Sequence, residues 1–161
     1  MRIPVISDTH GLLRPQIEER LHSAPAIIHA GDVGSQDGLD ALQAIAPLHV
    51  VRGNVDRASW CSLLPETDCF SLGGATIYMI HDELQLDIDP GPGGADVSAV
   101  ICGHTHKPME SVRDGVLRLN PGSVGPRRFS LPISMAWLTI SADKDNPAGV
   151  SLSVEFEEFE S

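Results

Sequence analysis

Five short motifs place residues that can bind metal ions at or just beyond the ends of apolar runs. They are Asp8-Thr9-His10, Gly31-Asp32, Gly53-Asn54, His81 and Gly103-His104-Thr105-His106. Their first candidate ligands occupy positions 8, 32, 54, 81 and 104, so neighbouring motifs are 22 to 27 residues apart. That interval fits one strand together with the crossover that a parallel neighbour requires. Because ligand sites in open α/β sheets gather at the carboxyl ends of the strands, we expect the motifs to converge at one edge.

The candidate ligands offer oxygen and nitrogen donors and no thiolate. They are Asp8, His10, Asp32, Asn54, His81, His104 and His106. Such a set suits Mn²⁺, Fe²⁺, Ni²⁺, Co²⁺ or Zn²⁺ better than Ca²⁺ or a structural zinc ion. The set is too large for one tetrahedral ion but fits two ions that share a carboxylate. Paired ions roughly 3.5–4 Å apart can clamp the attacking and leaving oxygens of a phosphoryl displacement, so the set predicts phosphoester chemistry.

The elements that would position these motifs change in character along the chain. In the first third, apolar strands alternate with stretches of helical periodicity, which indicates βαβ units and a parallel sheet. The expected strands there are 3–6, 26–29 and 48–51, and the expected helices are 15–22 and 37–46. The remainder is rich in strand signals, with hairpins expected at Gly73-Gly74 and Asp114-Gly115, a loop at 87–96, and strands at 98–102, 133–140 and 150–156. We expect a single domain over 1–161, with two packed sheets and helices outside.

Bulk composition narrows the classes of partner. The formal net charge of −11 argues against duplex nucleic acid or an anionic membrane, since both are recognised through basic surfaces. The three cysteines match no metal-binding spacing and favour a reducing cytoplasm. We expect neither a signal peptide nor a membrane span. Trp60, Leu63 and Leu64 predict either core or a subunit interface, which leaves a homo-oligomer open.

The ordered series Asp-x-His, Gly-Asp, Gly-Asn-x-Asp, His and Gly-His-x-His resembles the calcineurin-like metallophosphoesterases. Within that superfamily it is most similar to the small phosphodiesterases of the YfcE-like branch. The similarity runs from Ser7 to Val124, which is most of the chain. It implies an α/β fold built as a four-layer αββα sandwich of two mixed β-sheets.

The resemblance also implies roles for the ligands and a reaction. It assigns Asp8, His10 and His106 to one ion, Asn54, His81 and His104 to a second ion, and Asp32 to both. The implied cofactor is a pair of divalent ions, with Mn²⁺ expected first and Ni²⁺, Fe²⁺, Co²⁺ or Zn²⁺ as alternatives. A hydroxide bridging them would attack the phosphorus of a small-molecule phosphodiester in line.

Two positions depart from the family pattern. Val55 stands where many members have a histidine that protonates the leaving group, so this chain lacks that general acid, which is typically worth roughly 10²- to 10⁴-fold. Asp82 stands where the family often has glycine after the metal-binding His81. Asp82 either tolerates a left-handed backbone at that turn or orients His81 from behind. Asp56 follows Val55 and is interpreted as either a helix cap or a catalytic residue.

Residues near position 120 supply candidate substrate contacts. Asn120-Pro121-Gly122-Ser123-Val124 matches a family segment close to the active site, and Arg127 and Arg128 follow it. A guanidinium there could clamp a phosphate oxygen, although two solvated surface charges are the simpler interpretation.

Three functions compete. The first is a metal-dependent phosphodiesterase, the second a non-catalytic interaction scaffold of the same fold, and the third a narrow-specificity phosphomonoesterase or nucleotide hydrolase. Scaffold relatives have lost histidine ligands, whereas His10, His81, His104 and His106 are all present here. Ligand retention therefore favours the enzyme.

Overall fold

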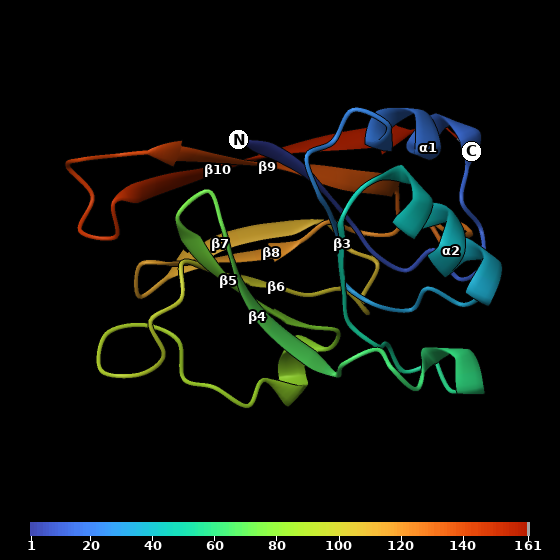
Figure 1. Ribbon diagram of the computed structural model, residues 1–161, viewed down its shortest axis with the longest axis horizontal. Helices are drawn as coiled ribbons and strands as arrows, with labels where there is room; N and C mark the ends of the chain where they lie inside the picture. The colour runs from blue at the N-terminus through green and yellow to red at the C-terminus, as the bar shows by residue number, and fades with distance from the viewer. Residues whose placement is uncertain (161) are drawn as a thin grey trace.

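The computed structural model describes residues 1–160 and contains two five-stranded mixed sheets that pack face to face (Figure 1). The first sheet has the order β10-β9-β1-β2-β3, with β1 Arg2–Ile6, β2 Ile27–His29, β3 Leu48–Val50, β9 Ile133–Ala142 and β10 Val150–Phe159. The second has the order β4-β5-β6-β8-β7, with β4 Thr67–Leu72, β5 Ala75–Ile80, β6 Ala99–Ile101, β7 Met109–Arg113 and β8 Val116–Asn120.

Each sheet combines a parallel centre with antiparallel edges. Strands β1, β2 and β3 run parallel, as do β5, β6 and β8. Strands β9, β4 and β7 pair antiparallel with their neighbours. The carboxyl ends of the parallel strands of both sheets meet on one side, so the loops after β1, β2, β3, β5 and β6 can face one another.

The main core lies between the sheets, where Ile3 and Val5 of β1 belong to the same buried cluster as Ile77, Met79 and Ile101. Helices α1 (Pro15–Leu21) and α2 (Gln36–Ile45) cover the outer face of the first sheet. Their Ile17, Leu21 and Leu42 pack in a second buried cluster with Ile6 and Ile27 of that sheet. Removing these side chains from water drives the docking of both helices.

The outer face of the second sheet is covered by the chain between β5 and β6. Tyr78, Val100 and Val116 of the sheet pack there with Leu86 and Ile88. The remaining secondary structure is two short 3-10 helices, η1 (Ser59–Cys61) and η2 (Glu83–Gln85). The predicted fold of two packed mixed sheets with flanking layers is confirmed, and the layer on the second sheet consists of loop and η2.

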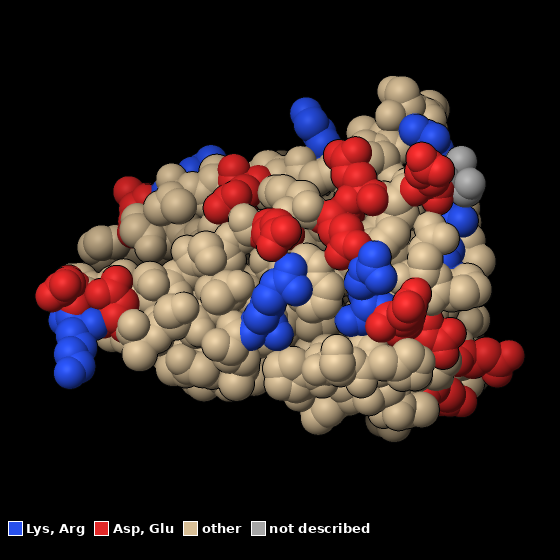
Figure 2. All heavy atoms as spheres, turned by 90° about the horizontal axis from the view of Figure 1, so that it is seen from above, with Lys and Arg blue, Asp and Glu red and all other residues tan. Residues whose placement is uncertain are grey.

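Local predictions agree closely with the structure. Both expected hairpins form, and the turn residues Gly73, Gly74, Asp114 and Gly115 have positive φ as such turns require. Strand β10 continues to Phe159, beyond the predicted end at 156, because it pairs with β9 along its whole length. Neither helix in the described part of the chain is long and apolar enough to cross a membrane. On the face seen in Figure 2, acidic and basic side chains are interspersed and the basic ones form no continuous patch.

Candidate metal centre

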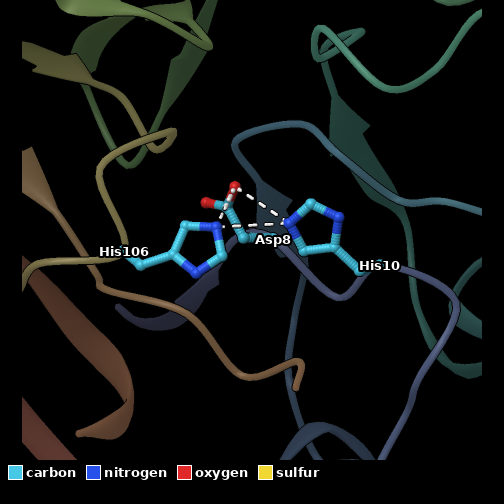
Figure 3. A group of neighbouring side chains, drawn as sticks. All are labelled: Asp8, His10 and His106. Atoms are coloured by element: carbon cyan, nitrogen blue, oxygen red, sulfur yellow. Dashed lines mark hydrogen bonds and ion pairs between the residues drawn. The ribbon is translucent and has the colours of Figure 1, made fainter. Parts of the chain in front are cut away.

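Asp8, His10 and His106 form the buried part of the site, and they come from the loops after β1 and β6 (Figure 3). The Oδ1 of Asp8 lies 3.2 Å from His106 Nε2 and 3.7 Å from His10 Nε2. The two Nε2 atoms are 3.2 Å apart. One carboxylate oxygen and two imidazole nitrogens therefore point into the same small space.

Asp32, Asn54, His81 and His104 form the second part of the site beside that group, which we call the open part because Asn54 and His104 are exposed, whereas Asp32 and His81 are buried. His81 Nε2 lies 3.3 Å from Asp32 Oδ2 and 3.1 Å from Asn54 Oδ1. His104 Nδ1 lies 3.0 Å from the same Asn54 oxygen. His10 Nε2 is 3.8 Å from Asp32 Oδ2, and His81 Nε2 is 3.9 Å from Asp8 Oδ1. The carboxylates of Asp8 and Asp32 thus lie between the two parts, and all seven predicted ligands converge.

The backbone of this site is held in an unusual conformation. Positive φ angles occur at Asp8 (57°), His10 (48°), Asp32 (58°), His104 (70°) and His106 (60°). Only two other non-glycine residues of the described chain, at positions 114 and 129, share this feature. Left-handed backbone is disfavoured for L-residues and clusters at functional sites when surrounding structure enforces it. The strain therefore marks five of the seven residues that the motifs indicate, and Asn54 and His81 do not share it.

Hydrogen bonds outside the centre fix the orientation of its ligands. Ser7 Oγ and the His104 backbone N–H donate to Asp8 Oδ2 at 2.6 and 3.1 Å, which leaves Oδ1 facing the histidines. His81 Nδ1 lies 2.7 Å from the Ala30 carbonyl, so this nitrogen carries the proton and Nε2 presents a lone pair. The histidine tautomer follows from the partner, as is usual for metal ligands.

The histidines of the centre lower the pKa values of the two carboxylates, Asp8 and Asp32. Burial alone would raise the pKa of Asp8, but His10, His106 and His81 hold that pKa well below its usual range. Burial likewise opposes ionisation of Asp32, and its hydrogen bond with His81 lowers the pKa below normal. Both carboxylates are therefore anionic at neutral pH and available to a cation.

A buried carboxylate oxygen without a hydrogen-bond partner shows that these residues suit a divalent ion. Asp8 Oδ1 is one of the few buried side-chain polar atoms in the described residues that have no hydrogen-bond partner. An orphaned carboxylate oxygen costs free energy unless a cation or donor satisfies it. Close backbone approach is also built in, because a Cβ on Gly103 would overlap Ser7 Oγ and approach Asp8 Oδ2 to 2.8 Å. The mixed nitrogen and oxygen donor set suits first-row transition ions.

Asp56, for which the sequence left two interpretations, has a third role. Its buried carboxylate accepts hydrogen bonds from the backbone N–H groups of Val33, Gly34 and Gly53. It therefore ties the loop that carries Asp32 to the loop that carries Asn54. The Gly-Asn-x-Asp motif provided the residue, but only the fold shows that its partners are backbone amides.

His29 and Asn120 also support the loops from within. His29 is fully buried, accepts from Gly31 N at 3.1 Å and lies 3.0 Å from Thr9 Oγ1. Asn120 donates to the Gly103 carbonyl at 2.7 Å and to Thr105 Oγ1 at 3.0 Å. Asn120, predicted as a substrate contact, is thus occupied in holding the Gly-His-x-His loop. Its segment is close to the site, as expected, but its amide is turned into the protein.

The two candidate arginines, Arg127 and Arg128, have different partners, and only one of them lies at the centre. Arg128 Nη2 lies 3.4 Å from His10 Nε2 at the edge of the centre. Arg127 Nε instead donates to the Leu131 carbonyl at 3.2 Å. Of the pair, Arg128 alone is placed where it could meet a phosphoryl oxygen.

The open part of the centre borders a cavity of about 260 Å³. Its wall includes three of the four candidate ligands of that part, Asn54, His81 and His104. The complete lining is Arg52, Gly53, Asn54, Glu66, Thr67, Ile80, His81, Asp82, Gln85, Asp87 and His104. Val55 is exposed nearby, and its backbone N–H donates to Asp32 Oδ1 at 2.9 Å. A small molecule can therefore reach the open part, and the Val55 side chain brings no proton to it.

Comparisons with known proteins identify the family of this chain. Residues 1–143 match the Calcineurin-like phosphoesterase superfamily domain. A "Probable metallophosphoesterase" of Methanothermobacter thermautotrophicus is 33% identical over 156 residues, covering 89% of this chain and 88% of that protein. The "Probable metallophosphoesterase YsnB" of Bacillus subtilis is 32% identical over 152 residues, covering 89% of this chain and 86% of that protein.

Solved structures show the same fold. Vacuolar Protein Sorting 29 from Cryptosporidium parvum superposes with a TM-score of 0.72 at 22% identity, covering 99% of this chain and 98% of that one. Yfce, a phosphoesterase from E. coli, superposes with a TM-score of 0.63 at 24% identity, covering 90% of each chain. With the family domain matched over most of the sequence, the chain belongs to the calcineurin-like phosphoesterase superfamily.

Proposed function

We propose that this protein is a metal-dependent phosphodiesterase that hydrolyses small phosphodiesters with two divalent ions. The observation that carries the proposal is the convergence of all seven predicted ligands around the paired carboxylates of Asp8 and Asp32. Asp8, His10 and His106 would hold one ion, Asn54, His81 and His104 the other, and Asp32 both. Ions held there supply a lowered pKa of bound water and neutralise charge on phosphoryl oxygens.

The chain's own groups then shape the reaction. The Arg128 guanidinium, beside His10, can donate to a phosphoryl oxygen and orient the ester. At the open part, Val55 offers no proton, so the leaving oxygen departs as an anion or takes its proton from water. Activated esters, whose leaving groups are stable anions, should therefore react faster than alkyl esters. The ratio of these two rates should be larger here than in family members that have a histidine at this position.

The test compares bis(4-nitrophenyl) phosphate with 4-nitrophenyl phosphate in the presence of Mn²⁺. We expect turnover of the diester, loss of turnover with EDTA and recovery on adding Mn²⁺. Asp32→Ala should lower the rate by roughly 10³-fold, since the charge stabilisation lost amounts to several kcal/mol. Asp40→Ala, an exposed change on α2, is the matched control. Turnover that survives both chelation and Asp32→Ala would refute the mechanism, and turnover of the monoester alone would favour a phosphomonoesterase.

An interaction scaffold is the second candidate, and one specific observation favours it. Leu63, Leu84 and Phe129 are each more than 90% exposed. Leu84 lies two residues after Asp82, and Phe129 follows Arg128 directly. Exposed large apolar side chains near one site can mark a protein-binding surface. The retained ligands favour the enzyme, and a protein that turns over no phosphoester yet binds a partner equally well with and without EDTA would reverse that preference.

The proposed setting is the cytoplasm, with a small-molecule phosphoester as substrate and neither duplex nucleic acid nor membrane as partner. The three free cysteines support a reducing compartment, and the net charge of −11 disfavours polyanionic surfaces. A homo-oligomer is compatible with the exposed Leu63, and light scattering of the purified protein would determine its oligomeric state.

A further inference from the structure

His104 is the least restrained histidine of the centre. Its side chain is 41% exposed, against 13% for His10 and 6% for His81. The ring meets the His81 ring edge to face, with centroids 5.3 Å apart. Its Nδ1 faces Asn54 Oδ1, so Nδ1 is the nitrogen that can bind an ion and Nε2 points away from the centre. Packing alone does little to hold this ring in place.

Asp82 lies on the outer side of that ring. Its Oδ2 is 3.9 Å from His104 Nε2. Its Oδ1 accepts a hydrogen bond from the Leu84 backbone N–H at 3.0 Å and thereby caps η2. The carboxylate is fixed by one oxygen, which leaves the other free to face the imidazole.

The turn that carries Asp82 is itself anchored to the second sheet. The Gln85 backbone N–H donates to the Asp82 carbonyl at 3.0 Å. Glu83, the next residue, pairs with Arg118 Nη1 of β8 at 3.3 Å, and the Arg118 side chain is almost fully buried. A buried guanidinium is costly without a partner, so this pair resists displacement of η2. The position of Asp82 is therefore set by β8.

The two roles expected of Asp82 from the sequence are both excluded. Its φ is −108°, so the position requires no left-handed backbone. The Nδ1 of His81 is bonded to the Ala30 carbonyl, so Asp82 does not orient His81. The expectation that Asp82 replaces a turn glycine or serves His81 is wrong, because the chain turns at η2 and directs the carboxylate toward His104.

We propose that Asp82 is a positioning residue for the second metal ion, acting through His104. Its carboxylate lies beside Nε2, the nitrogen on the outer side of the ring, and so favours the ring orientation in which Nδ1 is directed toward Asn54 and His81. The distance is longer than a direct hydrogen bond, so the effect is mainly the attraction between the carboxylate and the N–H dipole. Carboxylates behind ligating histidines are worth roughly 10- to 100-fold in metal affinity. The inference rests on the proposed two-metal function.

Asp82→Asn is the critical variant, because the asparagine oxygen can still cap Leu84 while the charge is lost. Mn²⁺ binding is measured by calorimetry, and Co²⁺ binding by the visible absorption of each successive equivalent. We expect the Kd of the second ion to rise roughly 10- to 100-fold, with an altered Co²⁺ spectrum for that equivalent and an unchanged first ion. Asp87→Asn is the matched control, since Asp87 lines the same cavity and its carboxylate bonds to the Tyr78 hydroxyl instead of facing His104.

Each other outcome overturns a different statement. If Asp82→Asn binds the second ion as the wild type does, or if Asp87→Asn weakens it equally, Asp82 has no special role toward His104. Complete loss of the second equivalent would make Asp82 a direct ligand and not a positioning residue. If the wild-type protein binds fewer than two ions, the proposed function fails before Asp82 is tested.

Discussion

The two parts of the metal centre differ in how the protein holds them. Left-handed backbone occurs in both parts, at Asp8, His10 and His106 and also at Asp32 and His104, so exposure is what separates them. Asp8 and His106 are buried. Asn54 and His104 are exposed, border the cavity and touch each other through a single oxygen. Rigid, desolvated ligands bind an ion with little loss of conformational freedom, whereas exposed ligands must be ordered by it. Under the proposed function, we therefore expect the buried part to retain its ion and the exposed Asn54 and His104 to make the second ion easier to exchange.

The strongest test of this difference removes one ligand from each part. Asp8→Asn should remove the first ion, which Asp8 would hold with His10 and His106, and should weaken binding of the second, because Asp8 Oδ1 also lies 3.9 Å from His81 Nε2. It should lower turnover by roughly 10³-fold or more. Asn54→Ala should remove only the second ion. Elemental analysis after gel filtration counts the ions. Equal losses in the two variants would show that the parts are not distinct.

A steric probe of the buried part should have the next largest effect. Gly103→Ala places a methyl group against Ser7 Oγ and Asp8 Oδ2, and such overpacking should cost roughly 3 kcal/mol of unfolding free energy and weaken binding of the first ion. Gly93→Ala is the control. It has a φ of +85° and nothing within 4 Å, so it should cost about 1 kcal/mol from backbone strain alone without changing metal affinity. Chemical denaturation and metal titration measure both quantities.

The support beneath the buried part should be sensitive to acid. Burial lowers the pKa of His29 to about 4, so the folded protein prefers neutral imidazole. Its stabilising contribution is complete above the unfolded pKa of roughly 6.5 and is lost as the pH falls toward 4, a change on the order of 3 kcal/mol. Urea unfolding of metal-free wild type and His29→Gln should show the stability difference shrinking over that window.

Wild type must be compared with His29→Gln because His81 changes the stability with pH in the opposite direction. Although burial opposes its protonation, Asp32 and Asp8 raise the pKa of His81, so its contribution is present in acid and is lost as the pH rises. Subtracting the His29→Gln curve removes this term. A stability difference that is independent of pH would contradict the assignment of His29 as a buried neutral base.

The sequence predicted the sheets and the convergence of the candidate ligands because both depend on local signals. The strand-end motifs and the hairpin glycines specify their own surroundings, and the structure places them as expected. The second layer of contacts could not be predicted in the same way. Asp56 bonds to amides of a loop more than twenty residues earlier, and Asp82 meets His104 only because Glu83 anchors η2 to β8. Such partners depend on how separate loops pack, and the apolar periodicity of strands and helices does not predict loop packing.

The adjacent arginines give the finest test of where substrate meets the centre. Arg128→Ala should raise KM for the diester by roughly 10-fold, about 1.4 kcal/mol, because its guanidinium lies beside His10. Arg127→Ala should leave KM within about twofold, since Arg127 bonds to the Leu131 carbonyl. The two side chains have the same charge and follow one another in the chain, so long-range electrostatics would affect both variants alike. A KM that rises equally in both variants would assign the effect to the long-range electrostatic field of the two arginines. A rise in Arg128→Ala alone requires a direct contact with substrate. That contact would extend the substrate site from the open part to the edge of the buried part.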